Sequence, residues 1–335
     1  MQYYKGIIKV DKAVYHMGKR VTIKDIAAAA GVSSGVVSAV LSGNKAIRCS
    51  EERKALILDV IKKMNYRPNR AAQILGRKKS RLIGVLHYSP ESPYIAHLVG
   101  ELQKQLNQRD YLAIYGFWSN YEEAKSAFKS VLSYPIDGLI CTHNQLLELI
   151  PPELPTVFYF NIPGKCCVIP NYDKYIFDSL DYLTSIGHRK IGFFGWQETA
   201  LFEYFKEQLQ NRGGITCNEW CPSGQNNYSN GKIMADKFFK QENLPTALIC
   251  RNDITAFAVI NSAREHGIRV PEDLSVIGFD NIEAAQYFYP ALTSFGAPVE
   301  KIASSLLDTL FAGAKPGCQM IDLELHKRNT CSNMK

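Results

Sequence analysis

Short apolar runs alternate with helix-like stretches along most of this chain, from residue 82 to residue 278. Strands separated by helices favour parallel sheets covered by helices. We expect strands at 82–86, 111–115, 137–141, 156–160, 191–194, 247–250 and 274–278, and helices at 95–108, 121–132, 174–186, 199–211 and 254–266. These units suffice for two subdomains, and 335 residues at roughly 150 per domain allow a further small domain.

Net charge is distributed unevenly along the chain. Residues 1–80 hold 17 Lys and Arg against 5 Asp and Glu, a net charge of +12. Residues 81–335 hold 22 against 27, a net charge of −5. A basic head on a mildly acidic body indicates a polyanionic partner for the head. A solvated basic face is the simpler alternative that charge leaves open.

The basic head contains patterns for three short helices. The first begins after Thr22, a good N-cap, and ends at Gly31, where a positive φ costs little. The second begins at Ser33 and is interrupted at Gly43. The third begins after Ser50 and carries an apolar stripe.

Two short helices joined by a tight glycine turn and supported by a third form a helix-turn-helix, whose second helix enters the DNA major groove. Val36 and Val37 lie on the apolar side of that helix. Its exposed residues are expected to be small, which allows close approach to DNA. They are Ser34, Gly35, Ser38, Ala39 and Ser42.

Four segments of the head resemble the DNA-binding head of the lactose/galactose-repressor (LacI/GalR) family of bacterial transcription regulators. They read Val-Thr-Ile-Lys-Asp-Ile-Ala at 21–27, Ala-Gly-Val-Ser at 30–33, Val-Ser-Ala-Val-Leu-Ser-Gly at 37–43 and Asn-Tyr-Arg-Pro-Asn-Arg-Ala-Ala-Gln at 65–73. Their order and spacing make the match more specific than a general helix-turn-helix pattern. The resemblance implies a homodimeric repressor that binds a pseudo-palindromic operator in double-stranded DNA.

The resemblance also implies a hinge helix at 69–76 that forms on operator DNA. Leu75 would be the apolar wedge that enters the minor groove and kinks the duplex, with Ala72 on the same face one turn earlier. Arg70 and Lys78 would lie near phosphates. The alternative is a flexible basic linker without a wedge.

The family pattern then gives a full set of expected DNA-binding residues: Thr22, Ser33, Ser34, Gly35, Val36, Ser38, Ala39, Ser42, Tyr66, Asn69, Arg70, Ala72, Leu75 and Lys78. The family usually has Thr at the position of Val36 and Arg at that of Ala39. Arg is the commonest reader of guanine. We therefore expect a different half-site, with more weight on phosphate contacts and DNA shape.

The body resembles the periplasmic-binding-protein-like effector domain of the same family. The matching segments are 137–140, 187–191, 252–253, 271–280 and 290–294. The implied fold is α + α/β, with a helix-turn-helix head at 17–66, a hinge helix or linker at 67–80, and a two-subdomain effector-binding and dimerisation domain at 81–335. One subdomain would comprise about 81–172 plus 297–325, and the other about 173–294 plus 326–335. Residues 1–16 would be a disordered extension or precede the true translation start.

Such regulators bind a small ligand in the cleft between the subdomains, at the carboxyl ends of strands. Asp280 matches a family position that accepts hydrogen bonds from ligand hydroxyls or amines. Asn252 matches another, with helix capping as its alternative role. Tyr94 and Trp196 would present aromatic rings, with packing as the simpler alternative. A sugar is the expected ligand class.

Two departures from the family pattern bear on that ligand. Leu201 stands where the family commonly has Arg, and Asn161 follows Phe160 where it often has Asp. Loss of a guanidinium and a carboxylate removes the usual clamps for hydroxyl-rich or anionic ligands. A less polar ligand, or none, therefore stays open.

Motifs for other functions are absent from the sequence. It contains no GxSxG, HExxH, P-loop or GxGxxG, so we expect no catalysis and no cofactor. The nine cysteines contain no CxxC pair, so we expect no metal site, and adjacent Cys166 and Cys167 are either core thiols or a redox feature. No signal-like segment and no apolar run of about 18 residues occur, which favours a cytoplasmic protein at the nucleoid with no membrane partner. The alternatives are a solute-binding protein without a role on DNA and an enzyme on a similar scaffold.

Overall fold

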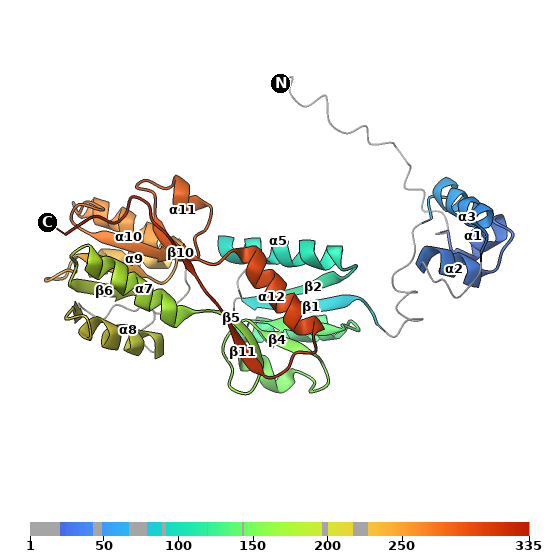
Figure 1. The fold of residues 1–335 in the computed structure, drawn as a ribbon, viewed down its shortest axis with the longest axis horizontal. Helices are drawn as coiled ribbons and strands as arrows, with labels where there is room; N and C mark the ends of the chain where they lie inside the picture. Colours follow the sequence, from blue (N-terminus) through green and yellow to red (C-terminus); the bar gives the residue numbers. More distant parts are fainter. Residues whose placement is uncertain are drawn as a thin grey trace, which may run out of the picture. The chain divides into compact units, whose positions relative to one another are not determined.

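The computed structural model describes residues 21–42, 49–66, 79–88, 92–118, 120–142, 144–195, 200–216 and 227–334 (Figure 1). The chain forms two compact units, the head (residues 1–80) and the body (residues 81–335). In the part that is described, no single helix is long and apolar enough to cross a membrane. The first two helices pass that test only together, by length and composition, as a pair bent by 106°.

Three helices form the described part of the head. They are α1 (Ile23–Ala29), α2 (Ser34–Ser42) and α3 (Glu51–Lys63). Buried apolar side chains from all three helices meet in one core, made of Ile26, Ala27, Ala30, Val37 and Ile57. Because this core is small, each member supplies a large share of the apolar surface that the head buries.

Local hydrogen bonds set where these helices begin and end. The Thr22 hydroxyl accepts a hydrogen bond from the Asp25 backbone N, and the Asp25 carboxylate accepts one of 2.8 Å from the Thr22 backbone N. This capping box begins α1. Gly31 follows α1 at φ +64°, a conformation that glycine adopts without strain. The Ser50 hydroxyl begins α3 by accepting from the Arg53 backbone N at 3.3 Å. The expected helix starts and the glycine turn are confirmed.

The N lobe of the body is a parallel six-stranded sheet in the order β11-β5-β4-β3-β1-β2. Its strands are β1 (Leu82–Tyr88), β2 (Leu112–Trp118), β3 (Gly138–Cys141), β4 (Thr156–Phe158), β5 (Cys166–Pro170) and β11 (Gly317–Ile321). Helices α5 (Pro93–Gln108) and α12 (Val299–Phe311) cover one face, and α6 (Tyr121–Leu132) with the 3-10 helix η1 (Asn144–Leu149) covers the other. Every residue of β3 is buried, as expected for a parallel strand covered on both faces.

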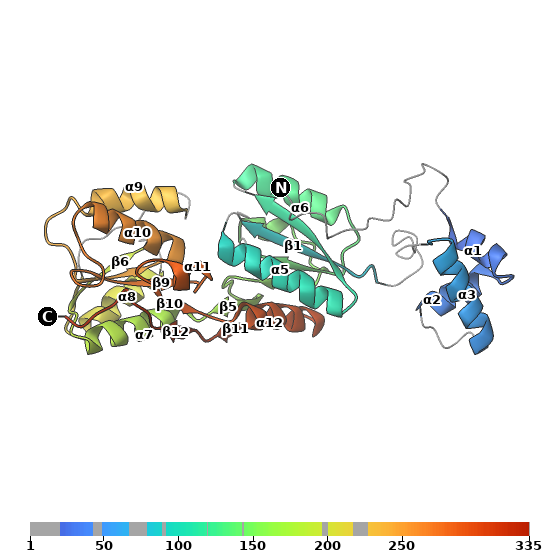
Figure 2. The ribbon, with the colours of Figure 1, turned by 90° about the horizontal axis from the view of Figure 1, so that it is seen from above.

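The C lobe is a second six-stranded sheet in the order β12-β10-β9-β8-β6-β7, in which only β12 is antiparallel to its neighbour. Its strands are β6 (Lys190–Phe194), β7 (Ile215–Thr216), β8 (Ala247–Cys250), β9 (Ser275–Phe279), β10 (Thr293–Gly296) and β12 (Glu324–His326). Its helices are α7 (Tyr172–Ser185), α8 (Ala200–Gln210), α9 (Tyr228–Phe238), α10 (Asp253–Glu265) and the short α11 (Ala284–Tyr287). Figure 2 shows α9 and α10 on one face of this sheet and α7 and α8 on the other.

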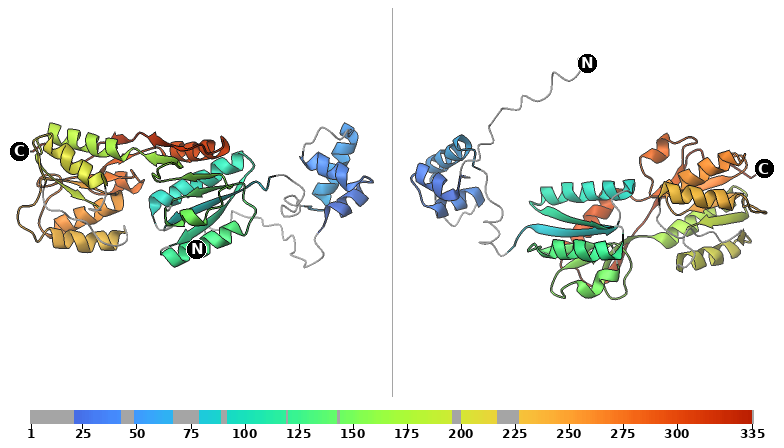
Figure 3. Two further views of the ribbon diagram at one scale, coloured as in Figure 1. Left: turned by 90° about the horizontal axis from the view of Figure 1, so that it is seen from below. Right: turned by 180° about the vertical axis from the view of Figure 1, so that it is seen from behind.

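The described chain passes between the two lobes at residues 170–172, 296–299 and 321–324 (Figure 3). The last passage comes slightly earlier than the sequence predicted. We expected the C lobe to resume at residue 326, but Glu324 already pairs with Gly296 of β10. The second sheet thus begins two residues before that approximate boundary, because residues 324–326 pair with β10.

The elements expected from the alternating pattern are all present, with ends shifted by a few residues. The pattern did not predict η1, β5, β7, α9 or the elements from α11 onward. Edge strand β11 is the clearest example of an element without a sequence signal, because four of its five residues are exposed and it carries no apolar run.

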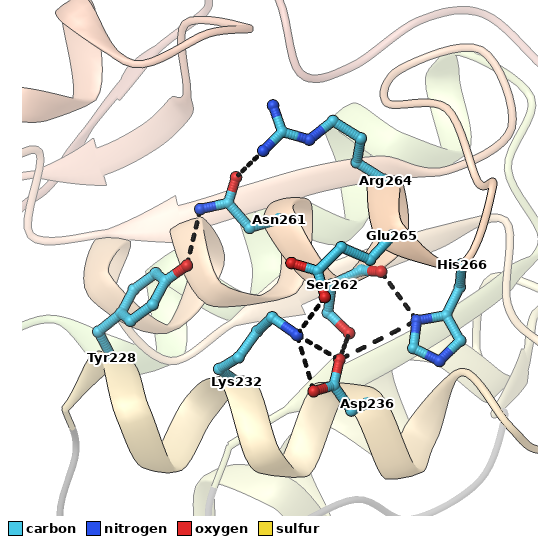
Figure 4. A network of polar contacts seen from close by, with 8 residues as sticks. All are labelled: Tyr228, Lys232, Asp236, Asn261, Ser262, Arg264, Glu265 and His266. Carbon is cyan, nitrogen blue, oxygen red and sulfur yellow. Dashed lines mark hydrogen bonds and ion pairs between the residues drawn. The ribbon is translucent and has the colours of Figure 1, made fainter.

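A polar network fastens α9 to α10 on the surface of the C lobe (Figure 4). Lys232 Nζ lies 2.6 Å from Asp236 Oδ1 and 2.7 Å from Glu265 Oε2, and the Ser262 hydroxyl donates to Asp236. The hydrogen bonds from Lys232 hold the pKa of Asp236 below its ordinary value. The network fixes α10, whose first residues lie at the site described next.

Candidate nucleic-acid interface and ligand site

Helix α2 presents a face of small residues to solvent. Gly35 and Ser38 are exposed and Ser34 is half-buried. The Ser33 hydroxyl accepts a hydrogen bond of 3.4 Å from the Val36 backbone N at the start of the helix. A face without bulky side chains allows the backbone of a helix to come close to a groove floor.

Val36 and Ala39, both expected among the DNA-binding residues, are partly or fully buried. Ala39 is only 6% exposed, so the prediction that it is exposed was wrong. It lies three residues after Val36, which is half-buried and packs on the head core. Residues three apart share a helix face, and a methyl group is too short to project beyond its neighbours.

Some of the remaining expected DNA-binding residues are described by the structure, and others lie outside the described residues. Thr22 is exposed and caps α1, and half-buried Tyr66 packs on the head core. Ser42 ends α2, and its side chain lies outside the described atoms. The others lie outside the described residues: Asn69, Arg70, Ala72, Leu75 and Lys78.

Exposed basic residues surround the helices of the head. Lys24, Arg53 and Lys62 are exposed. Lys63 forms an ion pair of 2.7 Å with Asp59. Such a surface favours binding of a polyanion through counterion release.

In the body, Tyr94 and Tyr159 join two segments of the N lobe. Tyr94 lies in the first turn of α5, is 8% exposed, and shares a hydrogen bond of 2.5 Å with the hydroxyl of Tyr159. Tyr159 directly follows β4. Desolvation raises the pKa of both phenols above the ordinary value, so both stay protonated and can donate and accept hydrogen bonds.

Asp280 follows β9 in a strained backbone conformation. Its φ is +100°, and that of Asn281 is +47°. The left-handed region is unfavourable for residues with a Cβ and is often found at functional sites. Gly296 makes room for this turn, because a Cβ there would lie 2.5 Å from the Cβ of Asn281.

The Asp280 carboxyl acts electrostatically on phenols of both lobes. Desolvation is the main cause of the raised pKa of Tyr94, Tyr159 and Tyr172, and the charge of Asp280 raises each further. Tyr172 is the first residue of α7, and its ring stacks on Phe279 at 5.3 Å. Sequence reasoning missed Tyr159 and Tyr172. Tyr159 lay inside the expected strand 156–160, and Tyr172 follows β5, which the sequence did not predict.

The pKa of Asp280 itself is raised well above its ordinary value. Burial is the main cause, the charge of Asp253 adds to it, and Arg251 opposes it. An acidic group in such surroundings, beside three phenols and at the carboxyl end of a parallel strand, is a candidate for ligand binding.

Asp253 holds the loop that carries Asp280. Its side chain is fully buried, accepts a hydrogen bond of 2.8 Å from the Ile282 backbone N, and accepts another of 2.5 Å from the Ser294 hydroxyl. Burial raises the pKa of Asp253 to about 7. The sequence indicated no role for Asp253 beyond its place in the matching segment 252–253.

The other expected ligand residues take different roles. Asn252 caps α10 by accepting a hydrogen bond of 2.8 Å from the Thr255 backbone N, which is the alternative role that the sequence allowed. Asn161 is exposed beyond the end of β4, and Leu201 packs on the core from the first turn of α8. Trp196 lies outside the described residues. Among the described side chains, no group of three His, Cys, Asp or Glu is placed to bind a metal.

Comparison with protein families identifies both parts of the chain. Residues 22–69 match the model of bacterial regulatory proteins of the lacI family, and residues 180–331 match that of a periplasmic binding protein-like domain. The chain is 32% identical over 312 residues to the HTH-type transcriptional repressor PurR of Pectobacterium atrosepticum, covering 86% of this chain and 89% of that one. It is 30% identical over 308 residues to PurR of Pasteurella multocida, covering 87% and 91%.

Solved structures share the fold at lower identity. A Lac repressor dimer bound to operator and the anti-inducer ONPF has a TM-score of 0.83 and 24% identity, covering 94% of this chain and 100% of that one. The transcriptional regulator CelR in complex with cellobiose has a TM-score of 0.66 and 20% identity, covering 93% and 100%. At these identities the likeness concerns the fold.

Proposed function

The chain belongs to the lacI family of bacterial regulatory proteins, and from that premise we propose that it is a DNA-binding transcriptional repressor whose operator affinity is set by a small ligand in the body. The observation that carries the DNA role is the exposed small-residue face of α2 on a head that matches the family over residues 22–69. The alternative of a solute-binding protein without a role on DNA leaves that head unexplained. The curated relatives are named as repressors, and we assign this chain no catalytic role.

In the proposed mode of binding, two chains form a homodimer on a pseudo-palindromic operator, in the cytoplasm at the nucleoid. Each α2 enters the major groove of one half-site, with Ser34, Gly35 and Ser38 closest to the bases. These small residues offer few donors to base edges. Specificity therefore rests heavily on phosphate contacts and DNA shape.

The segment 69–76 would form the hinge helix on operator DNA, with Leu75 as a minor-groove wedge. Leu75→Ala should weaken specific binding on the order of tenfold or more, because a wedge offsets part of the cost of kinking the duplex. Nonspecific, salt-sensitive binding should survive. Fluorescence anisotropy with operator and scrambled duplexes at two salt concentrations measures the specific and the nonspecific affinity. An equal loss on both duplexes would show that Leu75 is no wedge.

For the effector, we propose a small polar ring compound held between Asp280 and the phenols of Tyr94, Tyr159 and Tyr172. The Asp280 carboxyl would bind ligand hydroxyls or amines, and the tyrosine rings would pack on the ring faces. A sugar is the first candidate. Ligand binding would shift the angle between the lobes and thereby the spacing of the two hinges.

Selection from a random double-stranded DNA library with the full chain tests the proposed function. Enrichment of a two-fold symmetric site is the expected result, and that site then serves as the probe for a panel of sugars and nucleosides. Ile57→Ala, which removes a core side chain of the head, is the control. It should reduce enrichment if enrichment depends on the folded head. Failure to enrich any site, with or without the panel, would contradict a sequence-specific regulator.

A further inference from the structure

Two cysteines that are far apart in the sequence lie opposite each other in the N lobe. In the parallel pairing of β5 with β11, Cys167 is the direct partner of Cys318. Direct partners on neighbouring strands project to the same face of the sheet. Cys166, next along β5, projects to the opposite face and belongs to a different cluster of the core.

The two thiols differ in exposure and have different surroundings. Cys318 is exposed on β11, the edge strand of the sheet, whereas Cys167 is 1% exposed. The Cys167 thiol accepts a hydrogen bond of 3.3 Å from the Ile162 backbone N and lies 3.6 Å from the Ile162 carbonyl oxygen. Partial burial raises the pKa of Cys318, and the charge of the Cys167 thiol and a side-chain hydrogen bond between the two thiols raise it further. The two thiols therefore lie near enough to influence each other electrostatically.

We propose that Cys167 and Cys318 form a reversible disulfide, with Cys318 as the thiol that reacts first with an oxidant from solution. Neighbouring strands lie about 4.8 Å apart, and disulfides join Cα atoms about 4.4–6.8 Å apart. The spacing of Cα atoms on paired strands therefore lies within the range that a disulfide spans. This proposal does not rest on the proposed function.

A small disulfide such as oxidised glutathione supplies the oxidising equivalents. Cys318 loses its proton to solvent, and its thiolate attacks one glutathione sulfur, which breaks the S–S bond and releases one glutathione thiolate. Cys167 then loses its proton, attacks the Cys318 sulfur and releases the second glutathione. Two protein thiols are oxidised and one glutathione disulfide is reduced to two thiols. Because the thiolate is the nucleophile and the pKa of Cys318 is raised, the first step is faster at alkaline than at neutral pH.

The position of the bridge connects it to movement of the lobes. Cys167 lies four residues before Asn171, and Cys318 lies four residues before Asp322, where the chain passes between the lobes. Asn171 Nδ2 donates a hydrogen bond of 3.1 Å to Asp322 Oδ1, and the Asn171 backbone N donates one of 2.9 Å to the Ile321 carbonyl. A covalent bond between β5 and β11 would fix the starting points of both passages and restrict their local opening.

Peptide mapping under non-reducing conditions tests the bridge on the full chain. The protein is equilibrated with reduced and oxidised glutathione in several ratios and then alkylated. We expect one crosslinked pair of peptides containing Cys167 and Cys318, lighter by two hydrogens than the separate peptides, that disappears after reduction. Cys318→Ser should abolish it, and Cys166→Ser, which alters the adjacent thiol on the opposite face, should leave it intact.

Two results would overturn the pairing. One is a stable glutathione adduct on Cys318 with Cys167 still a free thiol, and the other is a bridge that joins either cysteine to a different one. Hydrogen exchange tests the link to the lobes. Residues 168–171 and 319–322 should exchange more slowly in the oxidised protein than in the reduced protein or in Cys318→Ser. Equal exchange rates in the oxidised and reduced forms would refute the coupling to the lobe passages.

Discussion

The exposed face of α2 is built from residues that are close in the sequence, whereas the surroundings of Asp280 come from four separate segments. Ser34, Gly35 and Ser38 need only a helix and a small core beneath it. Tyr94 and Tyr159 are 65 residues apart, and Asp280 follows a strand of the other lobe. We therefore expect the loss of one core side chain to destabilise the whole head. The loss of one side chain around Asp280 should remove only the ligand contact that this side chain makes.

The largest expected effect is in the head core. Ile57→Ala removes a fully buried side chain of α3 and should lower the free energy of unfolding of the head by about 2–5 kcal/mol. Leu58→Ala is the matched control, because Leu58 is 48% exposed on the same helix and should change stability by about 0.5 kcal/mol or less. Calorimetry and hydrogen exchange of the full chain measure both. Equal losses for the two variants would show that the small core does not set head stability.

The buried carboxyl of Asp253 should make stability of the body depend on pH. Burial raises the pKa of Asp253 from 3.8 to about 7, so between these values the folded protein keeps a proton that the unfolded chain has released. The stability gained from that proton is complete below about pH 4 and is lost as pH rises toward 7, at up to about 1.4 kcal/mol per pH unit.

Asp253→Asn cannot ionise and should lack this slope, whereas the exposed Asp173→Asn should retain it. Denaturant unfolding of the body at a series of pH values provides the measurement. An unchanged slope in Asp253→Asn would assign the pH dependence to other groups.

At the proposed ligand site, Asp280→Ala should abolish the effector response and leave operator binding intact. Loss of this hydrogen-bond partner leaves polar groups of the ligand unsatisfied and costs about 1–3 kcal/mol, or about 5- to 150-fold in ligand affinity. Asp280→Asn removes the ionisable carboxyl but keeps the backbone conformation, because Asn tolerates positive φ. This variant therefore tests the carboxyl apart from backbone strain. Titration calorimetry with the ligand found by the panel checks the effect, and a full response in Asp280→Ala would move the ligand site elsewhere.

Asn252→Ser distinguishes the two roles of that residue. Serine preserves the cap of α10, so a variant with normal stability and a normal effector response would leave Asn252 as a cap alone. A lost response at unchanged stability would show that Asn252 also contacts the ligand.

The smallest expected effect concerns the first turn of the head. Thr22→Ala removes the capping box of α1 and should destabilise the head by about 1 kcal/mol, whereas Thr22→Ser should preserve most of it. Thermal unfolding followed by circular dichroism of the full chain measures the difference. Identical behaviour of the alanine and serine variants would mean that the hydroxyl contributes little.

Sequence reasoning succeeded where the signal was local. The caps at Thr22 and Ser50, the turn at Gly31 and the buried strands each depend on a few adjacent residues, and all are confirmed. It failed at Ala39, whose burial depends on neighbouring side chains, and it gave no warning of edge strand β11, which lacks an apolar run.

The residues around Asp280 show more clearly what the sequence alone could not predict. The family resemblance placed Asp280 at a ligand position, and the structure places it directly after β9. The same resemblance also pointed to Asn161, which is exposed, and to Asn252, which caps a helix. No pattern near β4 or in α7 indicated that Tyr159 and Tyr172 would lie within electrostatic reach of Asp280.

The sequence by itself determined the family, the helix-turn-helix head and the alternation that yields two parallel sheets, because caps, turns and periodicity act over a few residues. Only the tertiary structure decided which polar groups gather in the body, that Asp253 holds the Asp280 loop, and that Cys167 faces Cys318. Burial and strand pairing join residues tens to more than a hundred positions apart, and the energy of a polar group depends on those distant neighbours rather than on the adjacent sequence.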